Sequence, residues 1–492
     1  MTTIARSSTD AGEISARRKQ LSLLILCGAV FLDALDISLL GVSLPSIKTG
    51  LGLSDGALQW LVSGYTVGYG GFLLLGGRVA DVWGRRRTFI AATVLFIIAS
   101  LLGGILTSGA LLIATRVLKG LAAGFTAPAA MSLITTTFRE GEERNRALGV
   151  FAMTGAGGYS FGLVLSGVLT EIDWRLVFFA PGAIAIAVLL AAPLIKADAP
   201  RSTGGPRQSF DLGGAITATL GIMALVYGLV QAPAWGWASV ETIGVLAGAV
   251  LLLIAFVVIE GRHSSPLVPL SLFRSRSLSS ANLVSVVWAG STIGWQFIAT
   301  LYLQEALHWS ALKTAFAFLP LGIVIVGVAK FAAGPLVSRW GIRAVVTIGM
   351  LIQATGVLLY LGVGTDSSYA LAILPGIILH GIGNGLVYPT VNIAGVSGVA
   401  DERQGVAAGV ITASYQVGAG VGVAVLAAVL TATAGGGAGD VSSYRWAFLV
   451  AGLFSLTGLA IGFQGLRQPR PAAAAPAATG AGAERAKVTA EH

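Results

Sequence analysis

Apolar residues along this chain fall into long runs, separated by charged turns or by turns rich in Gly, Pro and Ser. A helix needs about 20 apolar residues to cross the hydrocarbon layer of a membrane. In the first half, the runs predict membrane-spanning helices at residues 21–45, 57–78, 88–107, 109–137, 146–169, 175–195 and 212–231. In the second half, they predict helices at residues 241–260, 279–303, 311–336, 343–362, 369–396, 404–431 and 445–465. The pattern therefore predicts fourteen membrane-spanning helices.

Composition excludes an ordinary soluble fold. Of the 492 residues, 55% are hydrophobic and only 11% are charged, whereas a typical soluble domain has roughly 25% charged residues. Hydrocarbon offers no water to backbone groups, so such a chain must cross the bilayer as internally hydrogen-bonded helices. The single cysteine, Cys27, lies in the first apolar run and has no partner for an internal disulfide. The predicted class is an all-α integral membrane protein.

The distribution of Lys and Arg predicts the orientation of these helices. The two tails and the even-numbered loops hold 24 of the 31 basic residues, and the odd-numbered loops hold only four. Basic loops favour the cytoplasmic side, so both termini are predicted to be cytoplasmic. The least marked breaks between helices are Thr107–Ser108 and Trp235–Glu241. Losing either one would invert every later loop and remove the contrast, so the charge bias also supports the count.

An internal repeat divides the chain. Gly77 and Gly84 follow the second predicted helix, and Gly334 and Gly341 follow the tenth, each pair seven residues apart and followed by arginine. The offset is eight helices, which favours two bundles of six helices with two helices inserted between them. The predicted segments are a cytoplasmic tail at 1–20, a first bundle at 21–195, a cytoplasmic linker at 196–211, two inserted helices at 212–260, a cytoplasmic loop at 261–278, a second bundle at 279–465 and a disordered cytoplasmic tail at 466–492.

Several motifs resemble those of the major facilitator superfamily, and specifically its fourteen-span drug:proton antiporter family. The loop from Gly77 to Arg87 is similar to the superfamily signature, and Leu35 to Pro45 resembles the first-helix motif of the fourteen-span family. Further similar stretches are Asp173 to Phe178 and Tyr302 to Glu305, and the resemblance covers residues 20 to 465. It implies a major facilitator fold, with two six-helix bundles around a central cavity.

The first and fourth predicted helices each carry charged residues inside the membrane, where insertion of a charge costs about 2.5 to 3.5 kcal/mol. Asp33 and Asp36 share one face of the first helix, and Arg116 and Lys119 share one face of the fourth. Counted from the outer helix ends, Asp36 lies at the depth of Arg116, and Asp33 lies at the depth of Lys119. The sequence therefore predicts two matched pairs. A purely structural ion pair is the alternative interpretation.

The resemblance assigns proton coupling to this group. The family has an arginine at the position of Arg116, whereas Asp33 and Lys119 depart from its usual pattern. A carboxylate beside a cation stays ionised, and separation with burial favours its protonation. Alternating access would then let Asp36 release and take up one proton per cycle. Asp33 is predicted to be a second proton or cation site.

Two further motifs carry roles that the resemblance implies. The signature loop would clamp the two bundles in one conformation through Gly77, Asp81, Gly84, Arg85, Arg86 and Arg87. Binding of the arginines to anionic lipid headgroups is the other interpretation. Gly158, Gly162 and Gly167 on the fifth helix resemble the glycine motif associated with antiporters, although Leu163 stands where that motif has proline.

Polar and aromatic residues on other helices are candidates for the surface of the substrate cavity. These candidates are Tyr65, Trp288, Trp295, Gln296, His380, Asn384, Tyr388, Tyr415 and Gln416. Helix packing and hydrogen bonding between helices are the competing interpretations.

The predicted function is proton-coupled export of small lipophilic compounds from a bacterial cell, across its inner membrane. A dedicated exporter of one metabolite or self-made antibiotic is the alternative, and a membrane receptor or lipid-modifying enzyme is a remote one. The sequence has no nucleotide-binding P-loop, no cluster with metal-ligand spacing and no nucleophile elbow. We therefore expect no enzyme activity, no cofactor and no metal. The expected partners are small-molecule substrates, protons and membrane lipid, without nucleic acid, and the expected state is a monomer.

Overall fold

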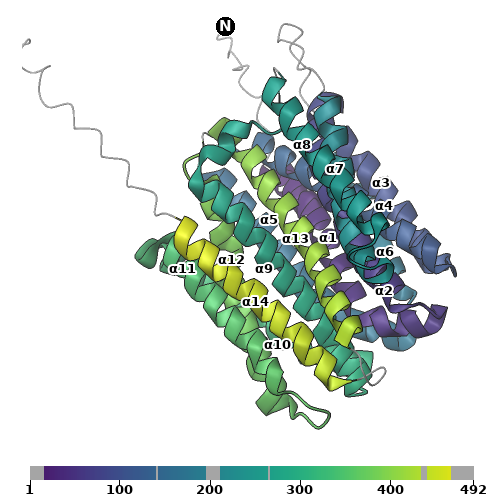
Figure 1. Ribbon diagram of the computed structural model, residues 1–492. Coiled ribbons are helices and arrows are strands. Elements are labelled where there is room, and N and C mark those ends of the chain that lie inside the picture. Colours follow the sequence, from purple (N-terminus) through teal and green to yellow (C-terminus); the bar gives the residue numbers. More distant parts are fainter. Residues whose placement is uncertain are drawn as a thin grey trace, which may run out of the picture.

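The computed structural model describes residues 16–139, 142–195, 211–263, 266–399, 401–433 and 440–466, and within these ranges the chain is helical and has no strand. The first seven α-helices are α1 (Ala16–Leu51), α2 (Asp55–Trp83), α3 (Arg85–Ile105), α4 (Gly109–Thr137), α5 (Glu142–Ile172), α6 (Leu176–Ala191) and α7 (Leu212–Trp235). The others are α8 (Val240–Arg262), α9 (Arg276–Leu301), α10 (Ala311–Val328), α11 (Gly334–Leu358), α12 (Leu374–Val396), α13 (Asp401–Thr433) and α14 (Val441–Gly465). Figure 1 shows them as long rods lying side by side.

The structure has a break between helices at each of the two positions where the sequence marks the break least clearly. The uncharged break falls between Ile105 and Gly109, and the second falls between Trp235 and Val240. Helix α1 is longer at both ends than the predicted 21–45 and carries Pro45 inside it. Most of residues 1–20, 196–211 and 466–492, predicted to be tails and a linker, lie outside the described residues.

Eleven helical stretches of the described chain are long and apolar enough to cross a membrane. One of them, Ala311–Gly362, joins α10 and α11 through a π-helical turn at Ala329–Ala333. Within α11, Gly341 leaves the helical conformation, with φ +82°. This break separates the two runs predicted at 311–336 and 343–362. The chain is therefore a multi-pass helical membrane protein.

Helix packing repeats with an offset of eight. Helices α1 and α5 pack together, as do α2 and α4, and α3 and α6; the equivalent pairs α9 and α13, α10 and α12, and α11 and α14 also pack together. The first and last six helices meet where α5 contacts α10 and where α2 contacts α13. Helices α7 and α8 pack on each other, and α7 lies against α2 and α13. The outer helix α8 exposes apolar side chains such as Val240, Leu251 and Ile254, as expected for a lipid-facing surface.

Backbone conformation supports the internal repeat. Gly84 lies between α2 and α3 with φ +111°, and Gly341 lies in the equivalent turn with φ +82°. Only glycine adopts positive φ of this kind without strain between Cβ and the backbone. Both copies of the motif therefore need glycine to reverse the chain sharply at the end of a helix.

Candidate functional site

A cluster of three charges lies inside the helices that form the first half of the fold. Asp36 on α1 accepts hydrogen bonds from Arg116 Nη1 and Lys119 Nζ, both on α4. The side chains of Asp36 and Arg116 are 2% exposed and that of Lys119 is 0% exposed. Two cations thus share one carboxylate away from water, so the cluster of three carries one net positive charge. A buried charge of this kind is stable only while its partners remain in place.

The predicted pairing of Asp33 with Lys119 is wrong. Lys119 contacts Asp36 instead, and Asp33 Oδ2 has no hydrogen-bond partner although only 7% of Asp33 is exposed. Depth along a helix does not determine such pairs, because a lysine stem is longer than the 5.4 Å rise of one helical turn. Lys119 Nζ also lies 4.8 Å from the centre of the Phe96 ring. The ammonium group therefore has this ring and Asp36 as its contacts.

Asp33 lies in a small pocket of its own. The pocket is lined by Asp33 together with Thr93, Thr126 and four apolar side chains from α1, α3 and α6. Thr93 and Thr126 each donate a hydrogen bond to a carbonyl of their own helix, at 2.8 Å. Each hydroxyl has one hydrogen, so what remains for Asp33 is acceptor capacity. A protonated carboxyl or a bound cation suits such surroundings better than a bare carboxylate.

Arg116 connects the charge cluster to α2. Its Nε donates to the Leu61 carbonyl at 3.0 Å, and its guanidinium lies over the Tyr65 ring, 4.8 Å from the ring centre. Guanidinium groups combine hydrogen bonding in a plane with stacking on aromatic faces. Arg116 is therefore fixed by three helices, α1, α2 and α4.

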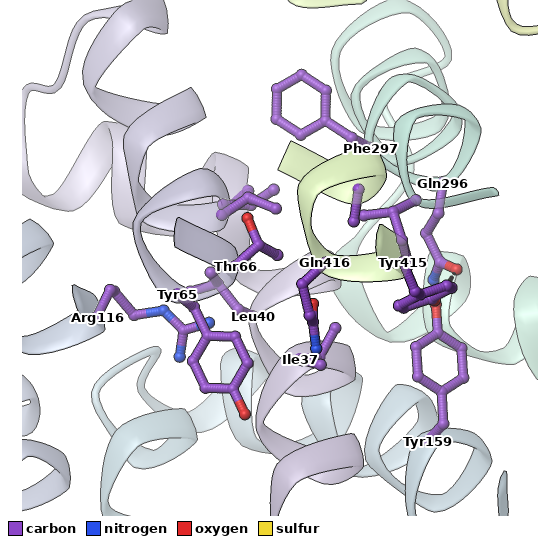
Figure 2. A pocket seen from close by; sticks show the side chains of 15 residues that line it. Ile37, Leu40, Tyr65, Thr66, Arg116, Tyr159, Gln296, Phe297, Tyr415 and Gln416 are labelled. Carbon is purple, nitrogen blue, oxygen red and sulfur yellow. Dashed lines mark hydrogen bonds between the residues drawn. The ribbon is translucent and has the colours of Figure 1, made fainter. Parts of the chain in front are cut away.

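A central cavity lies between the first six and the last six helices (Figure 2). Its lining combines Arg116 with four of the predicted cavity residues, namely Tyr65, Gln296, Tyr415 and Gln416. Gln296 on α9 accepts a hydrogen bond from Tyr159 on α5, which joins the two sets of helices across the cavity. The remaining lining residues are Ile37, Leu40, Gly41, Leu44, Val62, Thr66, Ile293, Phe297 and Ala419.

Five predicted cavity residues, on α9 and α12, lie outside this lining. Trp295 stacks on His380 with ring centres 4.1 Å apart, and both side chains are fully buried. Trp288 packs against Tyr388 and Tyr415. Neither these four nor Asn384 belongs to the lining of the central cavity. Helical spacing alone does not show which face of α12 points to the cavity and which points to α9.

Sequence reasoning missed Tyr159 as a cavity residue. It directly follows Gly158 in the predicted glycine motif, and that position was a usable signal. Two consecutive residues on a helix point about 100° apart. When Gly158 faces α1, its neighbour is therefore directed toward the adjoining space between α5 and α9.

The glycine motif makes two helix contacts. Gly158 and Gly162 pack on α1, where an added Cβ at Gly162 would overlap Ser38 Oγ and lie 2.9 Å from the Leu35 carbonyl oxygen. Gly167 faces α10, where an added Cβ would lie 3.0 Å from Leu312 Cα. Leu163, at the proline position of the motif, is fully buried. Glycine thus lets backbones approach at both interfaces of α5.

We expect Gly162→Leu to destabilise the protein by about 1 to 3 kcal/mol, because the larger side chain must push α1 and α5 apart. The measurement is the thermal unfolding of the purified protein in detergent. Gly157→Leu is the matched control on the same helix, since nothing lies within 4 Å of a Cβ added there. Equal melting temperatures for the two variants would contradict the packing described.

The signature loop lies between α2 and α3. A Cβ added at Gly77 on α2 would lie 3.7 Å from Pro128 Cβ on α4. Arg85 forms an ion pair with Asp81 at 3.6 Å, and Arg86 donates to the Pro193 carbonyl at 3.2 Å. Arg87 is exposed. These contacts link the loop to the end of α6.

The opposite end of the molecule joins the first and last six helices through polar contacts. Lys48 at the end of α1 forms a 3.0 Å ion pair with Glu305, in the π-helical turn Tyr302–Ala306. Glu305 also accepts from Tyr444 at 3.2 Å, and Gln304 donates to the Val42 carbonyl at 2.8 Å. These contacts hold α1 against α9 and α14 at this end.

Apolar spans, a buried charge cluster and a cavity between two related sets of helices define a helical membrane transporter. Within the described ranges, no group of three His, Cys, Asp or Glu side chains is placed to hold a metal ion. The chain belongs to the Major Facilitator Superfamily, whose family model matches residues 26–423. Members of this family are transporters, so the chain is a transporter and not an enzyme.

Comparison with known proteins identifies relatives of this chain within the family. The chain is 36% identical to a cephamycin export protein of Amycolatopsis lactamdurans over 92% of its length and 94% of that protein. It is also 36% identical to a puromycin resistance protein of Streptomyces alboniger, over 83% of this chain and 81% of that protein. A bacterial homologue of the lysosomal transporter Spinster, solved in an inward-facing state, has the same fold, with a TM-score of 0.67 at 17% identity over 93% of this chain and all of that one.

Proposed function

We propose that this transporter exports small, largely apolar compounds from the cell in exchange for protons. The observation that carries the proposal is the buried cluster of Asp36, Arg116 and Lys119, whose arginine also lines the central cavity. A substrate in the cavity thereby touches a residue that holds the buried carboxylate. The export and resistance proteins among its relatives support the direction of transport.

We infer fourteen spans in the inner membrane of a bacterium, with both termini cytoplasmic. The bundles are residues 21–195 and 279–465, with two inserted helices at 212–260. Support comes from the packing pairs that recur with an offset of eight and from the basic residues of the even-numbered loops. The protein works as a monomer in contact with lipid, because the two bundles of one chain enclose the cavity between them.

Proton coupling in this proposal rests on breaking and remaking the contacts of Asp36. In the conformation described, two cations hold Asp36 ionised, while Asp33 has an unpaired oxygen in a pocket that favours a proton. A change of access that separates α1 from α4 would leave Asp36 unpaired, and protonation would remove the cost of its buried charge. Asp33 is the second proton site. No cofactor takes part.

Alternating access needs contacts that differ between the two ends of the molecule. Lys48 and Glu305 tie the bundles together at the outer end in the conformation described. The signature loop around Asp81 and Arg85 lies at the cytoplasmic end, where it clamps the bundles in the opposite phase of the cycle. Opening the outer end requires loss of the Lys48 ion pair.

A dedicated exporter of one compound is the second candidate. The cephamycin export protein among the relatives favours it, because its name specifies a single class of antibiotic. The test is expression of the chain in a host lacking its own efflux pumps, followed by growth inhibition with a panel of unrelated antibiotics. Multidrug export predicts at least fourfold protection against several structural classes, and a dedicated exporter predicts protection against one class. Protection against none of the antibiotics in the panel would contradict export of antibiotics.

A further inference from the structure

The central cavity has a one-sided charge. Of its fifteen lining residues, all within the described chain, Arg116 is the only charged one and none is acidic. Asp36 does not compensate for this, since Lys119 and Arg116 both contact it and leave the cluster with a net positive charge. Asp33 lies in a separate pocket. In the conformation described, an organic cation entering the cavity would therefore meet a cation and no counter-ion.

Three residues of the cavity lining have buried polar atoms without partners. Gln296 and Gln416 are 5% and 4% exposed, and Gln296 Nε2 and Gln416 Oε1 have no hydrogen-bond partner. Tyr159 occupies the oxygen of Gln296, so this side chain offers a donor. Gln416 offers an acceptor, and the Tyr65 hydroxyl, also without a partner, offers both. Buried polar atoms are normally hydrogen-bonded, so these three are suited to a ligand.

The lining between these polar atoms is apolar. Ile37, Leu40 and Val62 come from the first six helices, and Ile293 and Phe297 come from α9. Figure 2 shows the Gln416 amide between the Tyr65 side and the Tyr159 side of the cavity. A ligand spanning these sides would have an apolar body and polar groups at its edges.

We infer that the cavity selects uncharged or singly anionic apolar molecules carrying a hydrogen-bond acceptor and a donor, and that it discriminates against organic cations. The acceptor would bind Gln296 Nε2 or Arg116, and the donor would bind Gln416 Oε1. This inference rests on the proposed export function for its biological meaning. Its physical content concerns binding alone.

The experiment uses three pyrene probes that differ in one substituent: hydroxymethyl, carboxylate or trimethylammonium. Binding to the purified full-length chain in detergent is followed by pyrene fluorescence anisotropy. The ammonium probe is expected to bind at least tenfold more weakly than the alcohol and the carboxylate. Gln416→Glu is expected to reverse this order, because it places an acid in the cavity, and Gln416→Leu is expected to weaken the alcohol alone.

Thr136→Glu is the control for added negative charge, since Thr136 is exposed on α4 and outside the cavity lining. Gln296→Glu is the second cavity variant if Gln416→Glu does not fold. Equal or tighter binding of the ammonium probe to the unaltered protein would overturn the inference, as would absence of binding by all three probes. An equal change of the probe affinities in Thr136→Glu would also overturn the inference.

Binding needs no proton gradient, so this result is separable from the proposed function. The predicted order of affinities without proton-driven transport would remove the antiport proposal and leave the selectivity standing. Proton-driven export of the ammonium probe at the rate of the alcohol probe would remove the selectivity and leave the antiport proposal standing.

Discussion

Arg116→Leu is expected to abolish transport and to destabilise the protein by less than the usual cost, about 3 to 5 kcal/mol, of removing the sole partner from a buried ion pair, because Lys119 still pairs with Asp36. The leucine leaves Asp36 with Lys119 alone and removes the side-chain donor to the Leu61 carbonyl. It also removes the charge that faces the cavity. The measurements are thermal unfolding in detergent and uptake by everted vesicles.

A triple variant separates the structural loss from the functional one. Asp36→Asn combined with Arg116→Gln and Lys119→Gln removes all three charges of the cluster, so most of the lost stability is expected to return. Transport is not expected to return, because no carboxylate remains at position 36 to take up and release a proton. Recovery of transport together with stability would show that the ion pair is only structural.

Asp33→Asn is expected to fold normally. Its proton-driven accumulation of substrate is expected to fall at least tenfold. Asparagine resembles a protonated carboxyl in shape, and Asp33 takes part in none of the contacts that hold Asp36. The change in stability is therefore expected to stay below about 1 kcal/mol. Accumulation with and without an imposed pH gradient is the measurement.

Substrate exchange without a gradient is the internal control for Asp33→Asn, and it is expected to continue at the unaltered rate. Asp36→Asn provides the comparison, because it leaves Arg116 and Lys119 unpaired beside each other and is expected to lower stability as well. Full proton-driven accumulation in Asp33→Asn would remove Asp33 from the coupling mechanism.

Hydrophobic runs predicted most of the fold because a membrane helix is defined by local sequence. The breaks at Thr107–Ser108 and before Val240 carry little charge, yet both are present. The glycine repeat also predicted structure, since Gly84 and Gly341 adopt positive φ in equivalent turns. In each case the determining interaction lies within a few residues of the chain.

Side-chain partners across helices were predictable only in part. Asp36 and Arg116 meet as expected, since both are constrained by depth and by the cost of burying a lone charge. The same argument gave the wrong partner for Lys119, because its flexible side chain reaches the Asp36 carboxylate. His380 and Trp295 stack on each other, and which face of a helix meets its neighbour depends on packing that one sequence does not display.

The lumenal pH of everted membrane vesicles tests proton-coupled export most directly. Vesicles with an acidic interior receive a panel of neutral, anionic and cationic antibiotics, and a pH-sensitive dye reports proton release. Our account predicts compound-dependent proton release from vesicles with the unaltered chain and none from vesicles with Asp36→Asn. Substrate accumulation without proton release, or equal release from the Asp36→Asn vesicles, would contradict it.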